Sequence, residues 1–237
     1  MIPRVNYLIA CSSHRVNRID SSGSLGKDAL RNHLQELAKT NTSRLAQVTI
    51  IRALPLTRND DAAFYWDIEE ASKGIVCPIK TLDVQDRYFS YSSWMHAVRK
   101  YRNEFDYYIM IEDDYYPSLP NFVDELIRIH TEKLPNGGYL NSFTTDIAAV
   151  SNGICDTKTI LECVDSYRDP IEELAGGSQN LFGKVCFNNK LADYTDQYRT
   201  LFWGGPGMVN ETHDLSLNLT TDIFRPIQYL RLGEVIF

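Results

Sequence analysis

The chain has 237 residues, of which 43% are hydrophobic and 23% are charged, and its formal net charge is −7. This is ordinary globular composition, enough for one large domain, and the acidic balance argues against a general binder of nucleic acid. No stretch approaches the roughly 18 consecutive apolar residues of a membrane span, and the first residues lack the pattern of a signal peptide, so we expect a cytoplasmic protein.

Short apolar runs alternate with amphipathic segments through the first half of the chain. Four runs are typical of buried strands, at residues 5–11, 46–54, 75–84 and 107–111. The segments between them favour a polar loop and then three helices, over residues 12–26, 27–40, 61–73 and 90–101. Because strands alternate with helices, the order predicts an α/β, Rossmann-like fold with a mostly parallel central sheet and helices on both faces.

The second half of the chain is less regular. Its residue pattern predicts a helix at 120–133 and a turn at 135–138. Two strands at 138–143 and 147–150 and a short helix at 158–164 are expected to follow. Residues 169–185 favour two helices separated at Gly176 and Gly177, and loops and short strands follow residue 198. No segment has the composition of a linker, so we expect a single domain over residues 1–237.

Three consecutive carboxylates, Glu112, Asp113 and Asp114, directly follow the apolar run at residues 107–111. In parallel sheets, ligands bind beyond the carboxyl ends of the strands. Adjacent carboxylates repel one another unless a cation neutralises them, and Mg²⁺ and Mn²⁺ prefer carboxylate and phosphate oxygens. The pattern therefore predicts a metal site that can bridge to a diphosphate, and the alternative is a solvated acidic turn.

The stretch IMIEDDYYPSLPNFVDELIRIH resembles the DxD region of GT-A-fold glycosyltransferases that use nucleotide sugars. It is especially similar to the EDD variant of the N-acetylglucosaminyltransferase I type, and the similarity is good over residues 90–122. The resemblance implies a GT-A fold in which residues 1–117 bind the nucleotide sugar and residues 118–237 bind the acceptor. It also implies that Asp114 ligates Mn²⁺, while Glu112 and Asp113 support the metal and the ribose.

The loop after the first predicted strand lies where GT-A enzymes hold the base and ribose of the nucleotide. The side chains that could do so here are Ser12, Ser13, His14 and Arg15, and the arginine could approach a phosphate. A polar loop with its charges in solvent is the alternative interpretation. Sugar nucleotidyltransferases share the topology but have a glycine-rich loop with a basic residue at this place, which the sequence lacks.

Inverting glycosyl transfer needs a carboxylate that takes the proton of the acceptor hydroxyl. Glu172, Glu173 and Asp169 fit the family's position for this base, at the start of a helix, although acidic residues also favour any helix N-terminus. His213 is a candidate further metal ligand, because many GT-A enzymes use a late histidine or aspartate in this way. An ordinary surface histidine is the alternative.

The sequence therefore predicts a glycosyltransferase dependent on Mn²⁺ or Mg²⁺ and acting in polysaccharide biosynthesis. Its donor would be a nucleoside diphosphate sugar, with UDP or GDP favoured, and its acceptor a carbohydrate. Two alternatives stay open. One is a metal-dependent nucleotidyltransferase or phosphohydrolase with the same acidic cluster, and the other is a non-catalytic module that binds a nucleotide or sugar.

Overall fold

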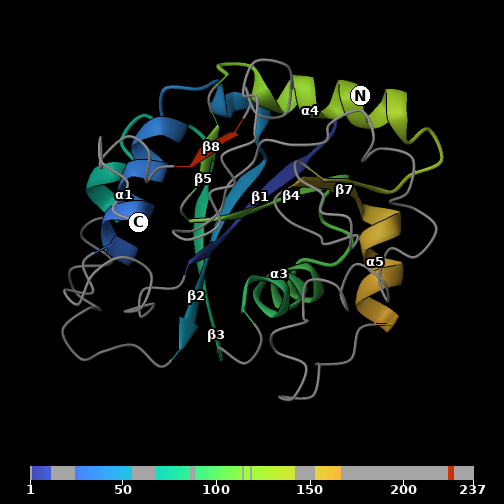
Figure 1. Ribbon diagram of the computed structural model, residues 1–237, viewed down its shortest axis with the longest axis horizontal. Coiled ribbons are helices and arrows are strands. Elements are labelled where there is room, and N and C mark those ends of the chain that lie inside the picture. The colour runs from blue at the N-terminus through green and yellow to red at the C-terminus, as the bar shows by residue number, and fades with distance from the viewer. Residues whose placement is uncertain are drawn as a thin grey trace, which may run out of the picture.

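A six-stranded sheet forms the centre of the molecule in the computed structural model (Figure 1), with strand order β3-β2-β1-β4-β7-β6. The residues that the structure describes are 2–11, 25–54, 68–85, 89–113, 115–117, 119–141, 153–166 and 224–226. The strands are β1 (Val5–Cys11), β2 (Gln47–Leu54), β3 (Ile79–Gln85), β4 (Tyr107–Glu112), β6 (Tyr139–Asn141) and β7 (Gly153–Asp156).

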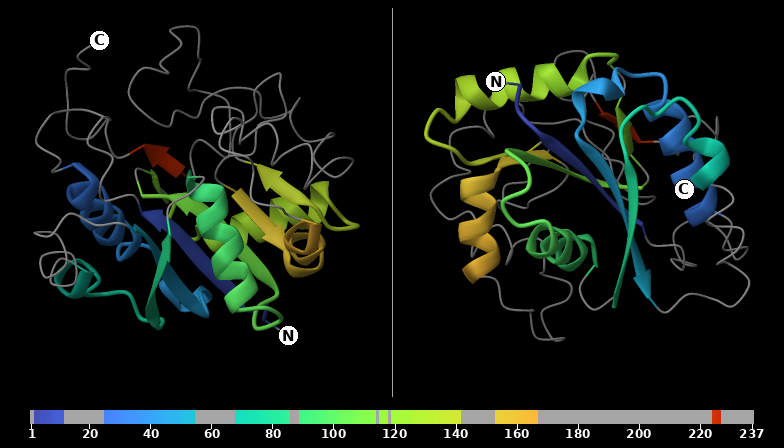
Figure 2. Two further views of the ribbon diagram at one scale, coloured as in Figure 1. Left: turned by 90° about the horizontal axis from the view of Figure 1, so that it is seen from below. Right: turned by 180° about the vertical axis from the view of Figure 1, so that it is seen from behind.

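The sheet is parallel from β3 to β4, and β7 pairs antiparallel with both β4 and β6. The principal helices are α1 (Leu25–Leu37), α3 (Phe89–Lys100), α4 (Phe122–Lys133) and α5 (Thr157–Ser166). Helices α1 and α4 pack on one face of the sheet, and α3 and α5 pack on the other (Figures 1 and 2). The expected fold class, α/β and Rossmann-like with a mostly parallel sheet and helices on both faces, is therefore confirmed.

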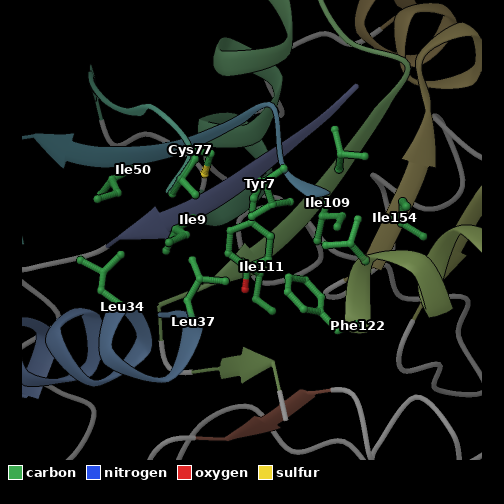
Figure 3. Close-up of a cluster of buried hydrophobic side chains, with 14 of the residues drawn as sticks. Tyr7, Ile9, Leu34, Leu37, Ile50, Cys77, Ile109, Ile111, Phe122 and Ile154 are labelled. Atoms are coloured by element: carbon green, nitrogen blue, oxygen red, sulfur yellow. The ribbon is translucent and has the colours of Figure 1, made fainter. Parts of the chain in front are cut away.

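Strand β1 is the centre of both hydrophobic layers, because all seven of its residues are buried. Successive side chains of a strand point to opposite faces, and here Tyr7 and Ile9 face α1 and α4 while Leu8 faces α3 and α5. In Figure 3, Leu34 of α1 lies near Ile9, and Phe122 of α4 lies near Tyr7. The rings of Tyr7 and Phe122 meet edge to face at 5.7 Å. The predominantly apolar run at residues 5–11 was therefore a correct signal for a strand covered on both faces.

Several element boundaries differ from the sequence prediction. Strand β3 begins at Ile79, four residues later than expected. Pro78, immediately before it, has no backbone N–H and cannot donate a hydrogen bond to a neighbouring strand. Helix α1 begins at Leu25 and ends at Leu37 rather than running over residues 27–40. Strand β7 was not predicted, whereas the predicted strand at residues 147–150 and the segment 169–185 lie outside the described residues.

Residues 68–71 are helical and are followed by Gly74 at φ +101°, a left-handed conformation that favours glycine. This agrees with the predicted helix end at this glycine, although residues 61–67 lie outside the described part of the chain. Across the part of the chain that the structure describes, no helix combines the length and the apolar character needed to cross a bilayer.

His130 of α4 connects that helix to the turn before β6, at the end of the sheet away from the acidic cluster. Its side chain is 2% exposed, and Nε2 donates to the carbonyl of Gly138 over 2.8 Å. The ring of Tyr107 packs edge to face on the imidazole, and Oδ2 of Asp156 lies 3.8 Å from Nε2. Burial lowers the pKa of His130, while the Gly138 carbonyl and the Asp156 carboxylate act in the opposite direction.

We expect the protein to lose stability as the pH falls below about 6.5, the ordinary pKa of an unfolded histidine. The pKa of His130 is lower in the folded state, so below that pH the unfolded chain binds a proton that the native chain excludes. Urea unfolding between pH 5 and 8 measures the effect. His130→Gln, which keeps a donor for the Gly138 carbonyl, should reduce the dependence on pH, and the matched change at the exposed His96 should not.

Candidate functional site

The carboxyl ends of the four parallel strands lie together at one edge of the sheet. The chain steps outward from β1 to β2 and β3 and then returns, through α3, to β4 on the other side of β1. The strand order therefore reverses between β1 and β4. In open α/β sheets, ligands bind in the crevice outside the carboxyl ends of the strands at such a point. Any nucleotide site of this fold is expected beside the last residues of β1 and β4.

The first two carboxylates of the acidic cluster occupy this position. Glu112 is the last residue of β4 and lies opposite Ala10 of β1 in the parallel register. The backbone N–H of Asp113 donates to the carbonyl of Ala10 over 3.1 Å, which extends the link between the two strands by one residue. The side chain of Asp113 is largely buried, since the residue is only 7% exposed. The carboxylate of Asp113 is therefore largely withdrawn from water at the switch point.

The side chain of Glu112 belongs to the face of β4 that packs on α3. Tyr108 and Met110 face α3 and α5, and Glu112 continues this alternation toward α3. The hydroxyl of Ser90, the second residue of α3, donates a hydrogen bond to Oε1 of Glu112. Ser90 is 4% exposed and Glu112 is half-buried, so the contact is partly shielded from water. The side chain of Glu112 is thus held against the N-terminal turn of α3.

The neighbouring strand ends have an ion pair of their own. Arg52 of β2 lies opposite Asp83 of β3, and its guanidinium makes two parallel contacts with that carboxylate, Nε to Oδ1 at 2.8 Å and Nη2 to Oδ2 at 2.6 Å. The side chain of Arg52 is 5% exposed and that of Asp83 is 40% exposed. Bidentate pairs of this kind fix the orientation of both side chains. In the register with β1, Arg52 also lies opposite Cys11, so the edge is polar on both sides of the β1 end.

A small second sheet follows the acidic cluster immediately. Strand β5 (Tyr115–Pro117) pairs antiparallel with β8 (Phe224–Pro226), so that Tyr116 lies opposite Arg225. The pair lies beside α1 in Figures 1 and 2. Residues close to the end of the sequence are thereby brought next to the residues that follow the carboxylates. Strand β5 was not predicted, and β8 falls in the region after residue 198 where short strands were predicted without bounds.

Of the predicted site residues, only Glu112 and Asp113 lie within the described residues, and the structure places both at the switch point. The others lie outside the described residues: Ser12, Ser13, His14, Arg15, Asp114, Asp169, Glu172, Glu173 and His213. Among the described residues, no three His, Cys, Asp or Glu side chains gather in a way that could hold a metal ion. The predicted metal site therefore stays a prediction that needs Asp114 or other residues from the rest of the chain.

Sequence reasoning missed Ser90, Arg52 and Asp83. A signal existed for Arg52, since it is a lone charge inside the apolar run IIRAL. The sequence gives no comparable sign for Ser90, because a serine near a helix start is common. Its contact with Glu112 joins residues that are 22 positions apart.

Comparison with known proteins shows similarity only at the level of fold. No family model and no curated protein matches the sequence. A cytidylyltransferase from Leptospira borgpetersenii is similar over 83% of each chain, with 12% identity and a TM-score of 0.49. A Bacillus anthracis protein assigned as a glucose-1-phosphate thymidylyltransferase is 10% identical with a TM-score of 0.48, over 84% of this chain and 97% of its own.

A third similar structure, assigned as a nucleotide-diphospho-sugar transferase from Desulfovibrio desulfuricans, is 14% identical with a TM-score of 0.41. The match covers 69% of this chain and 68% of that one. At these identities and scores we draw no conclusion about the reaction of this chain. The case for a function therefore depends on the residues at the carboxyl edge of the sheet.

Proposed function

We propose that this protein is a metal-dependent transferase that uses a nucleoside diphosphate sugar and transfers the sugar to a carbohydrate acceptor. The single observation that carries the proposal is the position of Glu112 and Asp113. They lie at the carboxyl end of the central strand β4, beside the end of β1, where the strand order reverses. Asp113 is largely buried there. A solvated acidic turn, the alternative from sequence, does not explain why a carboxylate is taken out of water.

The acidic cluster has the ligand chemistry that a divalent cation prefers. Mn²⁺ and Mg²⁺ take oxygen ligands, and Mg²⁺ is usually held by one or two carboxylates together with phosphate oxygens and water. Asp114 and Asp113 would hold the ion, with Glu112 beside them, and His213 is a further candidate ligand. When bound, the ion would neutralise the diphosphate and assist its departure.

The other roles follow from the chain's own residues. Strand β1 ends at Cys11, beside the end of β4 with Glu112. The residues that follow Cys11 in the sequence, Ser12, Ser13, His14 and Arg15, are therefore our candidates for contacts with the nucleotide. The N–H and O–H groups among them would donate to ribose and phosphate oxygens. On the acceptor side, Glu172, Glu173 or Asp169 would take the proton from the attacking hydroxyl.

Nucleotidyl transfer is the second candidate reaction. It would use carboxylates at the same edge, and it is the reaction named for two of the similar structures, the cytidylyltransferase and the thymidylyltransferase. These names fit the alternative better than they fit glycosyl transfer. The sequence lacks the glycine-rich loop with a basic residue that we expect of sugar nucleotidyltransferases after the first strand. The two reactions differ in donor, because one consumes a nucleoside diphosphate sugar and the other a nucleoside triphosphate with a sugar phosphate.

A thermal-shift panel separates these candidates. UDP-, GDP-, CMP- and dTDP-sugars are tested with and without Mn²⁺, beside UTP, CTP and dTTP under the same conditions. A ligand that binds only the folded state raises the melting temperature. At a ligand concentration of one hundred times its Kd, the free energy of unfolding rises by about 2.7 kcal/mol. We expect a shift with one diphosphate sugar, only when Mn²⁺ is present. A shift confined to triphosphates, with pyrophosphate released on adding a sugar phosphate, would select nucleotidyl transfer. No shift with any of them would reject both.

A further inference from the structure

We infer that Ser90 is a positioning residue, which holds the carboxylate of Glu112 in the orientation needed to bind the donor nucleotide and its metal. This inference depends on the proposed function for its ligand. The contact itself does not depend on it. The Ser90 hydroxyl donates to Oε1 of Glu112, from the first turn of one element to the last residue of another.

The direction of the hydroxyl is informative. A serine at a helix start commonly bonds to the backbone of its own turn. Ser90 instead donates to a side chain on β4, across the boundary between the helix layer and the sheet. Its hydroxyl has a single proton, so a bond to Glu112 uses its capacity as a donor. The group that benefits from the bond is therefore the glutamate at the switch point.

Glu112 needs such support more than Asp113 does. A glutamate has three side-chain torsions, and Glu112 is only half-buried, so packing alone does not fix its carboxylate. Asp113 has a shorter side chain and is largely buried, and its backbone is tied to Ala10. Binding is weakened when a ligand must order a mobile side chain, and a group fixed in advance avoids this loss. Ser90 supplies that fixation from a position where it is itself almost fully buried.

The charge at the end of β4 gives a second reason for the bond. Glu112 is followed directly by Asp113 and Asp114, and a free glutamate would swing away from its like-charged neighbours. A hydroxyl donor on Oε1 opposes this movement and keeps the carboxylate against the first turn of α3. There it can accept from a ribose hydroxyl or from water on a bound cation.

The test compares Ser90→Ala with two matched variants. Ser90→Thr keeps the hydroxyl, and Ser92→Ala removes a hydroxyl that is 2% exposed on the same helix turn. Calorimetry measures binding of Mn²⁺ alone, and then of UDP and GDP in the presence of Mn²⁺. We expect Ser90→Ala to weaken Mn²⁺-dependent nucleotide binding about tenfold, whereas Ser90→Thr and Ser92→Ala stay within about threefold of wild type. Equal losses in Ser90→Ala and Ser92→Ala would assign both serines to packing and overturn the inference.

A double-mutant cycle with Glu112→Gln tests whether Ser90 acts through Glu112. If it does, Ser90→Ala adds little in the Glu112→Gln background, whereas full additivity of the two losses contradicts the inference. The carboxyl ¹³C resonance of Glu112, recorded without ligand, is expected to move in Ser90→Ala and not in Ser92→Ala. If the wild type binds neither Mn²⁺ nor any nucleotide, the proposed function fails. The Glu112 resonance then still tests the hydrogen bond from Ser90. An unchanged chemical shift in Ser90→Ala rejects that bond, and a changed chemical shift supports it.

Discussion

Asp113→Asn is expected to abolish the stabilisation that nucleotides give in the presence of Mn²⁺. The substitution keeps the size of the side chain and leaves the backbone bond to Ala10 in place. It removes one negative charge from the end of β4, where the proposed ion would bind. Loss of a ligating or closely supporting carboxylate typically weakens metal binding by about 100-fold, or about 2.7 kcal/mol.

The melting temperature of ligand-free Asp113→Asn, recorded beside that of the wild type, separates a loss of ligand binding from a loss of folded protein. Asp113 is largely buried, so this comparison belongs in the same set of scans.

Asp124→Asn on α4 is the matched control. Asp124 is exposed and pairs with Arg44 on the surface, so its loss should change stability by less than about 1 kcal/mol and leave nucleotide binding intact. Thermal scans of the three proteins, with and without Mn²⁺ and nucleotide, make the comparison. A Mn²⁺-dependent shift that survives Asp113→Asn would remove this residue from the site and leave Asp114 to be tested next.

The sequence predicted the central strands well because burial on both faces leaves a plain pattern. Residues 107–111 are an unbroken apolar run, residues 5–11 are apolar except for Asn6, and the structure places strands at both. Strands β5 and β8 left no such pattern, since each has three residues and the two pair across more than a hundred positions. The antiparallel β7 was missed for a related reason, because it has four residues and starts with a glycine.

The position of the candidate site was predictable, but its supports were not. Glu112 and Asp113 follow a recognisable strand, and the rule for α/β sheets then places them at a ligand-binding edge. The contact from Ser90 and the pair between Arg52 and Asp83 depend on side-chain directions across separate elements. A single sequence carries little information about such contacts. Hence the sequence indicated where to look, and the structure added what holds Glu112 in place.

Gly153→Ala is expected to lower the free energy of unfolding by about 3 kcal/mol, which would reduce the melting temperature of a chain of this size by about 6–12 °C. Gly153 is the first residue of β7 and lies between Met110 of β4 and Asn141 of β6. A Cβ atom there would come within 2.2 Å of the carbonyl oxygen of Leu140, a backbone atom that cannot move without parting the strands.

Gly74→Ala provides the matched control, with the same chemical change in open surroundings. The nearest atom to its added Cβ would be Cβ of Ala38, at 3.5 Å, so only the left-handed backbone at φ +101° is strained. That strain costs about 1–2 kcal/mol. Urea unfolding of both variants measures the difference, and equal losses would mean that β6 and β7 are not as close at Gly153 as the structure has them.

Strand β7 lies between β4 and the edge strand β6. In Gly153→Ala, hydrogen exchange should therefore show weaker protection at residues 139–141 of β6 than at residues 107–112 of β4. The clash should therefore loosen the edge of the sheet first and leave the strand that ends in the acidic cluster in place.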